Sequence, residues 1–217
     1  MNFRHETVSF GEFEVRVRTL HDLQEFRDDD GEAEALGISS ASWPIFGVVW
    51  RSGRALAQLM VDHDVAGRRV LEVGCGIGLA SLVLNHRGAD ITATDYHPEA
   101  GRFLAANVEL NGGRPIPFAR ADWADEAPSG LGTFDLVIGS DLLYEDEHAA
   151  LLAGFIDRHT RPACEVIIID SARGYAGRFS KCMLALGYSY THERTSTLES
   201  EGEPYRGKIM RFVRPPG

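Results

Sequence analysis

The chain has 217 residues, of which 44% are hydrophobic, and its formal net charge is -10. This length can bury one substantial core but leaves little for a second, so we expect a single folding unit. The acidic balance argues against a nucleic-acid substrate, because phosphate contacts need many Lys and Arg side chains. It suits a cationic partner better, although net charge does not identify one.

The sequence contains no recognisable segment for targeting, membrane insertion or metal binding. Its first residues, MNFRHETVSF, lack the apolar core of a signal peptide, and no run approaches the roughly 20 apolar residues that span a bilayer. We therefore expect a cytoplasmic protein without membrane contact. The cysteines and histidines show no spacing typical of a metal site, so no metal is expected. The sequence does not indicate an oligomeric state.

Residues 1–46 are predicted to form an N-terminal extension. Within it, Phe13, Val15 and Val17 alternate with charged residues after a turn at 10–12, which predicts a β-hairpin over residues 7–20. Residues 47–62 carry apolar side chains near helical spacing and predict a helix. We assign this helix and the rest of the chain, residues 47–217, to the main domain.

The main domain alternates short β-rich runs with helical stretches, a pattern typical of a parallel sheet with helices on both faces. The last two predicted strands have no helical stretch between them, so they should form an antiparallel hairpin at the sheet edge. We therefore predict an α/β fold with a Rossmann-like, doubly wound sheet of seven strands. The predicted strands are residues 69–73, 90–95, 116–120, 134–139, 165–170, 188–193 and 208–213.

The strongest signal is the segment VLEVGCGIGLASLVL, in which a strand runs through glycines into an apolar helix. Gly74, Gly76 and Gly78 allow the backbone to turn tightly and to approach a ligand without a Cβ in the way. We expect a side chain at Gly76 to occupy space that the ligand needs. Asp95 ends the next strand about 20 residues later, where a carboxylate reaches a ribose hydroxyl. Together these residues predict a nucleoside site; a tight turn without a ligand is the alternative for the glycines alone.

Two features favour S-adenosylmethionine over NAD as the nucleoside. The glycines are spaced G-x-G-x-G, whereas a dinucleotide fingerprint is G-x-G-x-x-G/A. S-adenosylmethionine has no pyrophosphate, so the loop needs only to admit its amino-acid part. Glu72 precedes the loop by two residues and is expected to meet charge or water near the ligand's ammonium group.

The chain resembles class I methyltransferases and, more narrowly, the small seven-β-strand protein-lysine methyltransferases of the methyltransferase-like group. Four segments carry the likeness: GVVWRSGRALAQLM, VLEVGCGIGLASLVL, the pair Asp122 and Trp123, and FDLVIGSDLLY. The resemblance implies S-adenosylmethionine as cofactor, with Asp122 at the adenine amino group and Trp123 beside the base. Where the family has Trp-Pro this chain has Trp50 followed by Arg, and a Trp-Pro pair starts upstream at Trp43. Trp50 is our candidate for the cofactor contact, with Trp43 as the alternative.

The resemblance also implies an acceptor site. In the family, a D-x-x-Y motif holds the target amine beside the sulfonium methyl group, and Asp141 and Tyr144 match that motif. Ser140 lies at the same strand end and is expected to line the cofactor site. From the residues alone, the alternative is that Asp141 caps a helix beginning near residue 146 and Tyr144 only packs.

The predicted activity is N-methylation of an amine, and the resemblance makes a protein lysine the acceptor. A small-molecule amine N-methyltransferase fits a chain of this length equally. An NAD-dependent oxidoreductase is disfavoured by the glycine spacing. A catalytically silent S-adenosylmethionine-binding interaction module is a further alternative, against which the presence of both Asp141 and Tyr144 argues.

Overall fold

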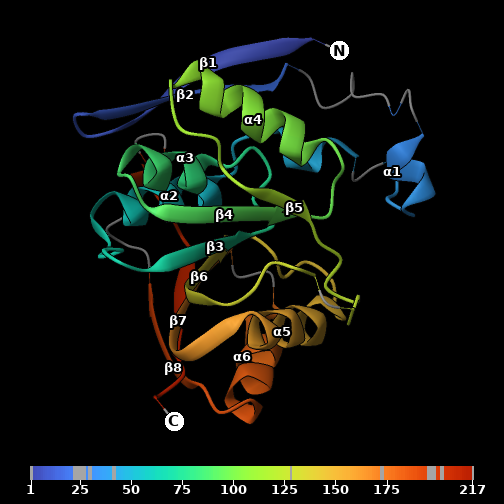
Figure 1. The fold of residues 1–217 in the computed structure, drawn as a ribbon, viewed down its shortest axis with the longest axis vertical. Coiled ribbons are helices and arrows are strands. Elements are labelled where there is room, and N and C mark those ends of the chain that lie inside the picture. Colours follow the sequence, from blue (N-terminus) through green and yellow to red (C-terminus); the bar gives the residue numbers. More distant parts are fainter. Residues whose placement is uncertain are drawn as a thin grey trace.

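The computed structural model describes residues 2–21, 28, 31–40, 43–127, 129–171, 174–194, 199–200 and 203–216. A seven-stranded sheet forms the centre of the molecule, and an N-terminal hairpin lies over the helices on one side of it (Figure 1). The predicted α/β fold with seven strands is confirmed. None of the helices in this part of the chain has both the length and the apolar character that a membrane crossing requires.

The central sheet has the strand order β5-β4-β3-β6-β7-β11-β8. Its first five strands are parallel, and β11 runs antiparallel to both β7 and β8. The predicted edge hairpin is confirmed, and its second strand is the one that joins β7. The strands are β3 (Arg69–Val73), β4 (Asp90–Asp95), β5 (Phe118–Arg120), β6 (Phe134–Ser140), β7 (Thr160–Asp170), β8 (Ser189–Arg194) and β11 (Lys208–Val213).

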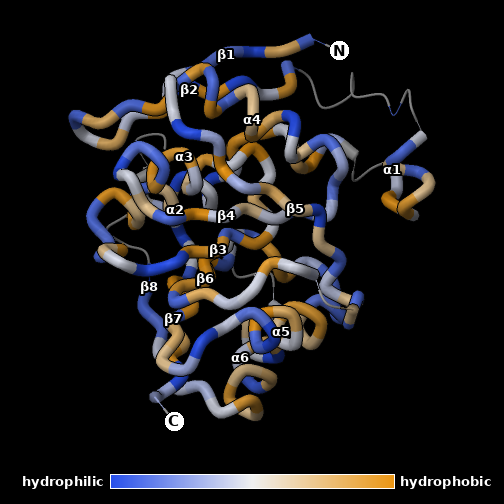
Figure 2. The backbone as a smooth tube through the Cα atoms, in the orientation of Figure 1, coloured by the Kyte–Doolittle hydropathy of each residue, from blue (hydrophilic) through white to orange (hydrophobic). Residues whose placement is uncertain are grey.

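Helices cover both faces of the sheet, which accounts for its nearly continuous apolar strands. In β7, Ile167 and Ile169 belong to the apolar cluster on one face, whereas Val166 and Ile168 belong to the cluster on the other. Figure 2 shows this apolar character along the inner strands. The first face packs against α2 (Arg51–Asp62), α3 (Leu79–His86) and α4 (Ala100–Leu110), and the second against α5 (His148–Arg158) and α6 (Ala176–Ala185).

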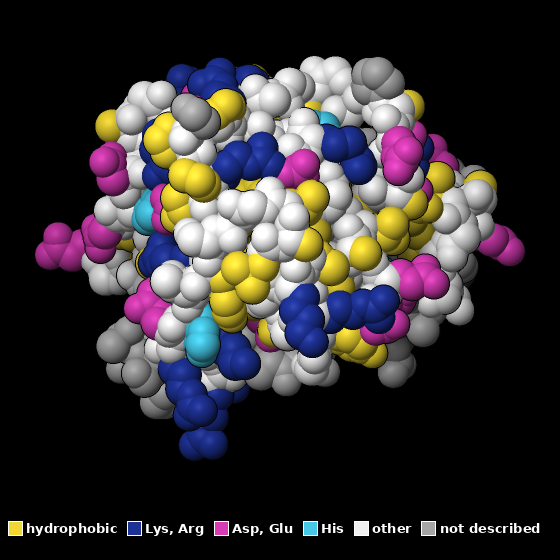
Figure 3. Space-filling view, turned by 90° about the horizontal axis from the view of Figure 1, so that it is seen from below, with side chains coloured by type: hydrophobic (Ala, Val, Ile, Leu, Met, Phe, Trp, Pro, Cys, Tyr) yellow, Lys and Arg dark blue, Asp and Glu magenta, His cyan; other side chains and the backbone are white. Residues whose placement is uncertain are grey.

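The surface seen from below carries basic, acidic and apolar side chains interspersed with one another (Figure 3). Two exposed leucines, Leu184 and Leu186, lie at the end of α6. The net charge of -10 is therefore not gathered into one acidic patch on this face.

Several boundaries differ from the sequence prediction, and three of the differences have a clear physical reason. The helix expected from residue 47 begins at Arg51, because Trp50 is extended (φ -80, ψ 148) and residues Trp43–Gly47 form a separate 3-10 turn, η2. The strand expected from residue 116 begins at Phe118, after a proline that has no N–H for the ladder. The strand expected from residue 165 begins at Thr160, which pairs with the start of β6 before a register shift.

The predicted N-terminal hairpin is present and begins earlier than expected, with β1 (Phe3–Phe10) paired to β2 (Phe13–Leu20). Two asparagines of α4 attach it to the domain. Asn107 accepts a hydrogen bond from the Arg18 N–H at 2.7 Å and donates to Ile77 O in the glycine loop at 3.2 Å. One helical turn later, Asn111 accepts from the Arg16 N–H at 2.9 Å. The remaining elements are α1 (Glu32–Ala35), β9 (Glu199–Ser200) and β10 (Glu203–Pro204).

These two asparagines provide a matched test of the attachment. Asn107 is fully buried, so Asn107→Ala leaves the Arg18 N–H and the Ile77 carbonyl without a partner and should lower the free energy of unfolding by about 2 kcal/mol. Asn111 is half-buried, so water can replace its amide, and Asn111→Ala should cost less than about 1 kcal/mol. Urea unfolding of both variants checks this, and equal losses would contradict it.

Candidate functional site

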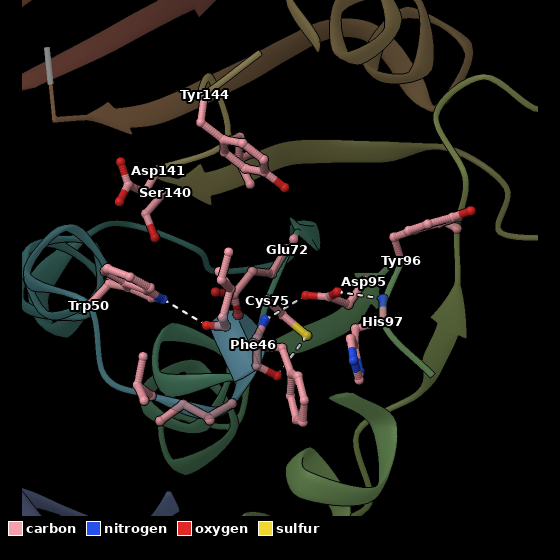
Figure 4. Close-up of a pocket in the computed structure, with 18 of the residues that line it drawn as sticks. Phe46, Trp50, Glu72, Cys75, Asp95, Tyr96, His97, Ser140, Asp141 and Tyr144 are labelled. Atoms are coloured by element: carbon pink, nitrogen blue, oxygen red, sulfur yellow. Dashed lines mark hydrogen bonds between the residues drawn. The ribbon is translucent and has the colours of Figure 1, made fainter. Parts of the chain in front are cut away.

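A cavity of about 360 Å³ opens at the carboxyl edge of the sheet, where β3, β4 and β6 end. Ligands of open α/β sheets bind at this edge, and the volume lies within the range of small-molecule sites. Figure 4 shows side chains from the three strand ends and from η2 around it. Of the predicted site residues, the cavity is lined by Trp50, Glu72, Gly74, Gly76, Asp95, Asp122, Trp123, Ser140, Asp141 and Tyr144.

The glycine loop turns tightly, and the missing Cβ atoms of its glycines would point toward neighbouring protein atoms. Gly74, Gly76 and Gly78 all have positive φ values, of 60, 53 and 78. A Cβ at Gly76 would lie 2.9 Å from the carbonyl oxygen of Phe46 in η2. A side chain at this position, which we expect to displace the ligand, would therefore also disturb the packing of the loop on η2. Gly78 is the N-cap of α3 and does not line the cavity.

Asp95 supports the glycine loop from the end of β4. One carboxylate oxygen accepts the Gly76 N–H at 2.7 Å, and the other accepts the His97 N–H at 2.8 Å. Burial raises the pKa of Asp95, and these two backbone donors oppose that rise. The carboxylate predicted to bind a ribose therefore lines the cavity and also fixes the shape of the loop.

Glu72 is a buried carboxylate at the end of β3. It accepts hydrogen bonds from the Ser81 hydroxyl and, at 2.9 Å, from the Ser81 N–H in the first turn of α3. Burial raises the pKa of Glu72 to about 7, and the neighbouring Asp95 adds to the rise. A positive charge beside Glu72 would favour its ionised form. This end of the cavity is thus suited to a cationic group.

The tryptophan at the start of α2 faces the cavity with its ring fixed. Trp50 is 38% exposed and its indole N–H donates to Ile45 O at 2.9 Å. The backbone of Trp43 begins η2, but its side chain lies outside the described part of the structure. The geometry therefore places Trp50 at the cavity and does not test Trp43.

Asp122 and Trp123 follow β5 and form another part of the wall. The Asp122 carboxylate accepts the Ala124 N–H at 2.9 Å, which closes a local turn, and the residue is exposed. Trp123 is half-buried and packs its ring edge-on against His148, with 5.5 Å between ring centroids. This arrangement gives an apolar surface with a carboxylate beside it, as predicted for an adenine pocket.

The segment after β6 brings the predicted acceptor residues to the same cavity. Asp141 has φ 57, and its carboxylate accepts a hydrogen bond from the Ser171 hydroxyl at 2.5 Å. It does not cap the next helix, because α5 begins at His148 with Glu147 as its N-cap. Tyr144 is 44% exposed and packs edge-on against His148, 4.6 Å between centroids. The alternative that Asp141 is a helix cap is therefore wrong.

Several cavity residues were not predicted from the sequence. Phe46 stacks on His97 with 4.0 Å between centroids, and burial lowers the pKa of His97 to about 4, so this imidazole is neutral near pH 7. Tyr96 donates its hydroxyl to Leu36 O at 2.7 Å and so ties the chain after α1 to β4. His148 touches the rings of both Trp123 and Tyr144. No motif marks these residues, because tertiary packing brings them together; only the position of Tyr96 and His97 after Asp95 was a signal.

The charges of the cavity fit the predicted cofactor. Among the described residues that line it, Glu72, Asp95, Asp122 and Asp141 carry carboxylates and none is Lys or Arg. A dinucleotide would bring two phosphate charges into this acidic wall, whereas S-adenosylmethionine carries a sulfonium and an ammonium group against one carboxylate and is a net cation. Coulomb interactions are strong in a partly buried site, so the wall favours the cationic ligand.

Comparison with known proteins gives results consistent with this geometry. A family model described as lysine methyltransferase matches residues 38–179. The chain is 32% identical over 164 residues to the electron transfer flavoprotein beta subunit lysine methyltransferase of Xenopus laevis, covering 74% of this chain and 63% of that protein. It is 35% identical over 118 residues to the protein N-lysine methyltransferase METTL21A of Danio rerio, covering 50% and 54%. The alignments thus span between half and two thirds of the length of these relatives.

Solved structures share the fold. A magnesium protoporphyrin IX methyltransferase of Synechocystis, solved with bound SAM, has a TM-score of 0.57 at 22% identity, covering 73% of this chain and 76% of that one. A structure from echinomycin biosynthesis, described by its conversion of a disulfide bond into a thioacetal group, has a TM-score of 0.60 at 21% identity, covering 80% and 85%.

We predict that a side chain at Gly76 destabilises the fold through its contact with Phe46. Gly76→Ala should lower the free energy of unfolding by about 2–3 kcal/mol, because it combines an unfavourable positive φ with a close contact to backbone. Gly67→Ala is the matched control: its φ is 69 but an added Cβ meets nothing within 4 Å, so only the conformational cost of about 1 kcal/mol remains. Urea unfolding measures both losses, and a loss at Gly76 no larger than that at Gly67 would refute the role of the Phe46 contact.

Glu72 should make the stability of the ligand-free protein depend on pH. In the folded protein the pKa of Glu72 is about 7, above the ordinary 4.5. Its contribution to the free energy of unfolding is therefore full below about pH 4.5 and is lost as pH rises through 7. Glu72→Gln removes this loss and should stabilise the protein at pH 8 by on the order of 2–3 kcal/mol, with little difference at pH 4.5. Thermal unfolding at several pH values tests this, with Glu109→Gln on the exposed side of α4 as the charge control. If the difference in stability between Glu72→Gln and the parent protein does not change with pH, the prediction is wrong.

Proposed function

Because the chain belongs to the lysine methyltransferase family, we propose that it methylates the side-chain amine of a lysine in a protein. Family membership confirms the resemblance carried by the four sequence segments, and with it S-adenosylmethionine as the cofactor. It also removes the NAD-dependent oxidoreductase from consideration. The observation that carries the proposal is the cavity whose described lining holds four carboxylates and no Lys or Arg, because both a sulfonium donor and an amine acceptor are drawn to such a wall.

Three parts of the cofactor have a partner among the residues of the cavity. We assign Glu72 to the ammonium end, Asp95 to the ribose, and Asp122 with Trp123 to the adenine. We assign Trp50 and Ser140 to the wall of the cavity, where Gly53 in the first turn of α2 also lies close to the Ser140 hydroxyl. When bound, S-adenosylmethionine supplies an electrophilic methyl group on a good leaving group, so the protein mainly has to align the acceptor and exclude water.

The acceptor side is formed by Asp141, Tyr144 and Trp50. The Asp141 carboxylate accepts a hydrogen bond from the amine and orients its lone pair; the amine reacts in its neutral form after losing a proton to water. The exposed rings of Tyr144 and Trp50 contact the alkyl stem and attract the ammonium group before it loses that proton. The three residues thus bind, orient and shield the amine without a dedicated acid.

We also propose that residues 1–46 and the domain from residue 47 to 217 form one folding unit, since Asn107 and Asn111 join the hairpin to α4. We propose a protein acceptor and no nucleic-acid substrate. The relatives of known name support the first point, because their names give protein lysines as targets. The acidic cavity supports the second.

The proposal is tested by labelling a heat-treated cell extract with the protein and tritiated S-adenosylmethionine. We expect label in discrete protein bands and in methylated lysine after hydrolysis. Label confined to small molecules would instead support an amine metabolite as acceptor, and cofactor binding without any labelling would support a silent binding module. Calorimetric titration should show binding of S-adenosylmethionine but not of NAD.

Asp141→Asn should separate orientation of the amine from cofactor binding. Asn has the same size and tolerates the positive φ of this position, so the fold and the affinity for S-adenosylmethionine should be retained. Labelling should fall on the order of 100-fold, because a neutral amide no longer aligns the amine as a carboxylate does. Tyr144→Phe keeps the aromatic ring and should reduce the labelling rate less than Asp141→Asn does. Labelling by Asp141→Asn at the parent rate would exclude the assigned role of this carboxylate.

A further inference from the structure

Asp141 is held in a backbone conformation that residues with a side chain rarely adopt. Among the described residues other than glycine, only Asp141 and Ala163 have a positive φ. Such conformations persist where the surroundings hold them, and they gather at functional sites. Hydrogen bonds to the next strand help to hold Asp141: its N–H donates to Ile169 O at 2.9 Å, and its carboxylate accepts from the Ser171 hydroxyl at 2.5 Å.

Ser171 reaches this carboxylate from the neighbouring strand. It is the first residue after β7, which runs parallel to β6 with Ser140 opposite Ile169. Parallel neighbours end at the same edge of the sheet, so the residues after β6 and β7 lie side by side. Asp141 lines the cavity, whereas Ser171 is half-buried and does not. The hydroxyl therefore contacts the carboxylate from outside the cavity.

The direction of the Asp141 carboxylate depends on such a partner. Figure 4 shows Asp141, Ser140 and Tyr144 extending in different directions from one strand end. The last torsion of an Asp side chain is broad, so the carboxylate plane is not set by the backbone alone. A hydroxyl hydrogen bond to an ionised oxygen is short and strong, and it restricts that torsion.

We propose that Ser171 is a positioning residue, whose hydrogen bond to Asp141 sets the direction in which the carboxylate receives the acceptor amine. This inference rests on the proposed function, in which Asp141 orients that amine. The hydroxyl of Ser171 does not touch the amine or the cofactor. Its effect on methyl transfer passes entirely through Asp141.

The first test compares Ser171→Ala with Ser171→Thr, using tritiated S-adenosylmethionine and a heat-treated cell extract as acceptor. Ser171→Ala should lower the maximal labelling rate on the order of 10-fold without changing the half-saturating concentration of S-adenosylmethionine. Ser171→Thr keeps the hydroxyl and should restore most of the rate. Ser129→Ala removes a hydroxyl that contacts His159 at 2.7 Å, near the opposite end of β6, and should keep the full rate. Ser171→Cys, a close match in size, replaces the Ala variant if that one does not fold.

The second test combines Ser171→Ala with Asp141→Gly, a change that suits the positive φ and removes the carboxylate. If Ser171 acts through Asp141, then Ser171→Ala lowers the rate in the parent protein but not in the Asp141→Gly protein. Urea unfolding should be measured for the parent, the two single variants and the double variant. The double variant should lose less free energy of unfolding than the sum of the losses in the two single variants. Calorimetry should show unchanged binding of S-adenosylmethionine.

The outcomes separate this inference from the proposed function. A parent rate for Ser171→Ala together with a large loss for Asp141→Asn overturns the role of Ser171 and leaves the function standing. A parent rate for Asp141→Asn overturns the role of Ser171 together with the assigned role of Asp141, whereas the proposed function itself is overturned only if the parent protein puts no label on lysine. An equal further loss from Ser171→Ala in the Asp141→Gly protein also overturns the inference, because the hydroxyl would then act on something other than Asp141.

Discussion

Two carboxylates at the ends of neighbouring parallel strands determine how the donor half of the cavity is built. Glu72 is the penultimate residue of β3 and Asp95 is the last residue of β4, and burial raises the pKa of both. Buried carboxylates need donors, and here three backbone N–H groups supply them, those of Ser81 in α3, Gly76 in the loop and His97 after β4, together with the Ser81 hydroxyl. The loop can supply them only if it turns within a few residues. The glycines, the start of α3 and the acidic wall therefore all follow from the need to provide hydrogen-bond donors to these two buried carboxylates.

The acceptor half follows a different rule, because its residues stay accessible. Trp50 and Tyr144 are 38% and 44% exposed, yet each ring is held, by Ile45 O in one case and by His148 in the other. His148 also touches Trp123, so one imidazole lies between the ring assigned to the adenine and the ring assigned to the acceptor. Packing thus connects the two halves without burying the acceptor side.

The sequence was informative where chain order and geometry coincide. Parallel strands end at one edge, so residues that follow separate strands, such as Asp95 and Asp141, were expected together and line one cavity. The sequence was uninformative where the structure depends on contacts between residues that are far apart in the chain. What a Cβ at Gly76 would contact depends on η2, in which Phe46 lies 30 residues earlier in the chain. Periodicity places the helix after η2 too early, because it does not detect the extended backbone of Trp50. Ser171 likewise carries no motif and reaches Asp141 only through the pairing of β6 with β7.

The contrast between the halves bears on the choice of acceptor. The donor half holds its polar groups in hydrogen bonds with the protein itself, so its shape does not depend on what is methylated. The acceptor half offers two exposed rings and a carboxylate held at a strained position. A small amine would leave these rings largely in contact with water, whereas a lysine on a protein brings a surface that covers them as its side chain enters. Burial of aromatic area is a main source of affinity at protein interfaces, and this favours a macromolecular acceptor over a free amine.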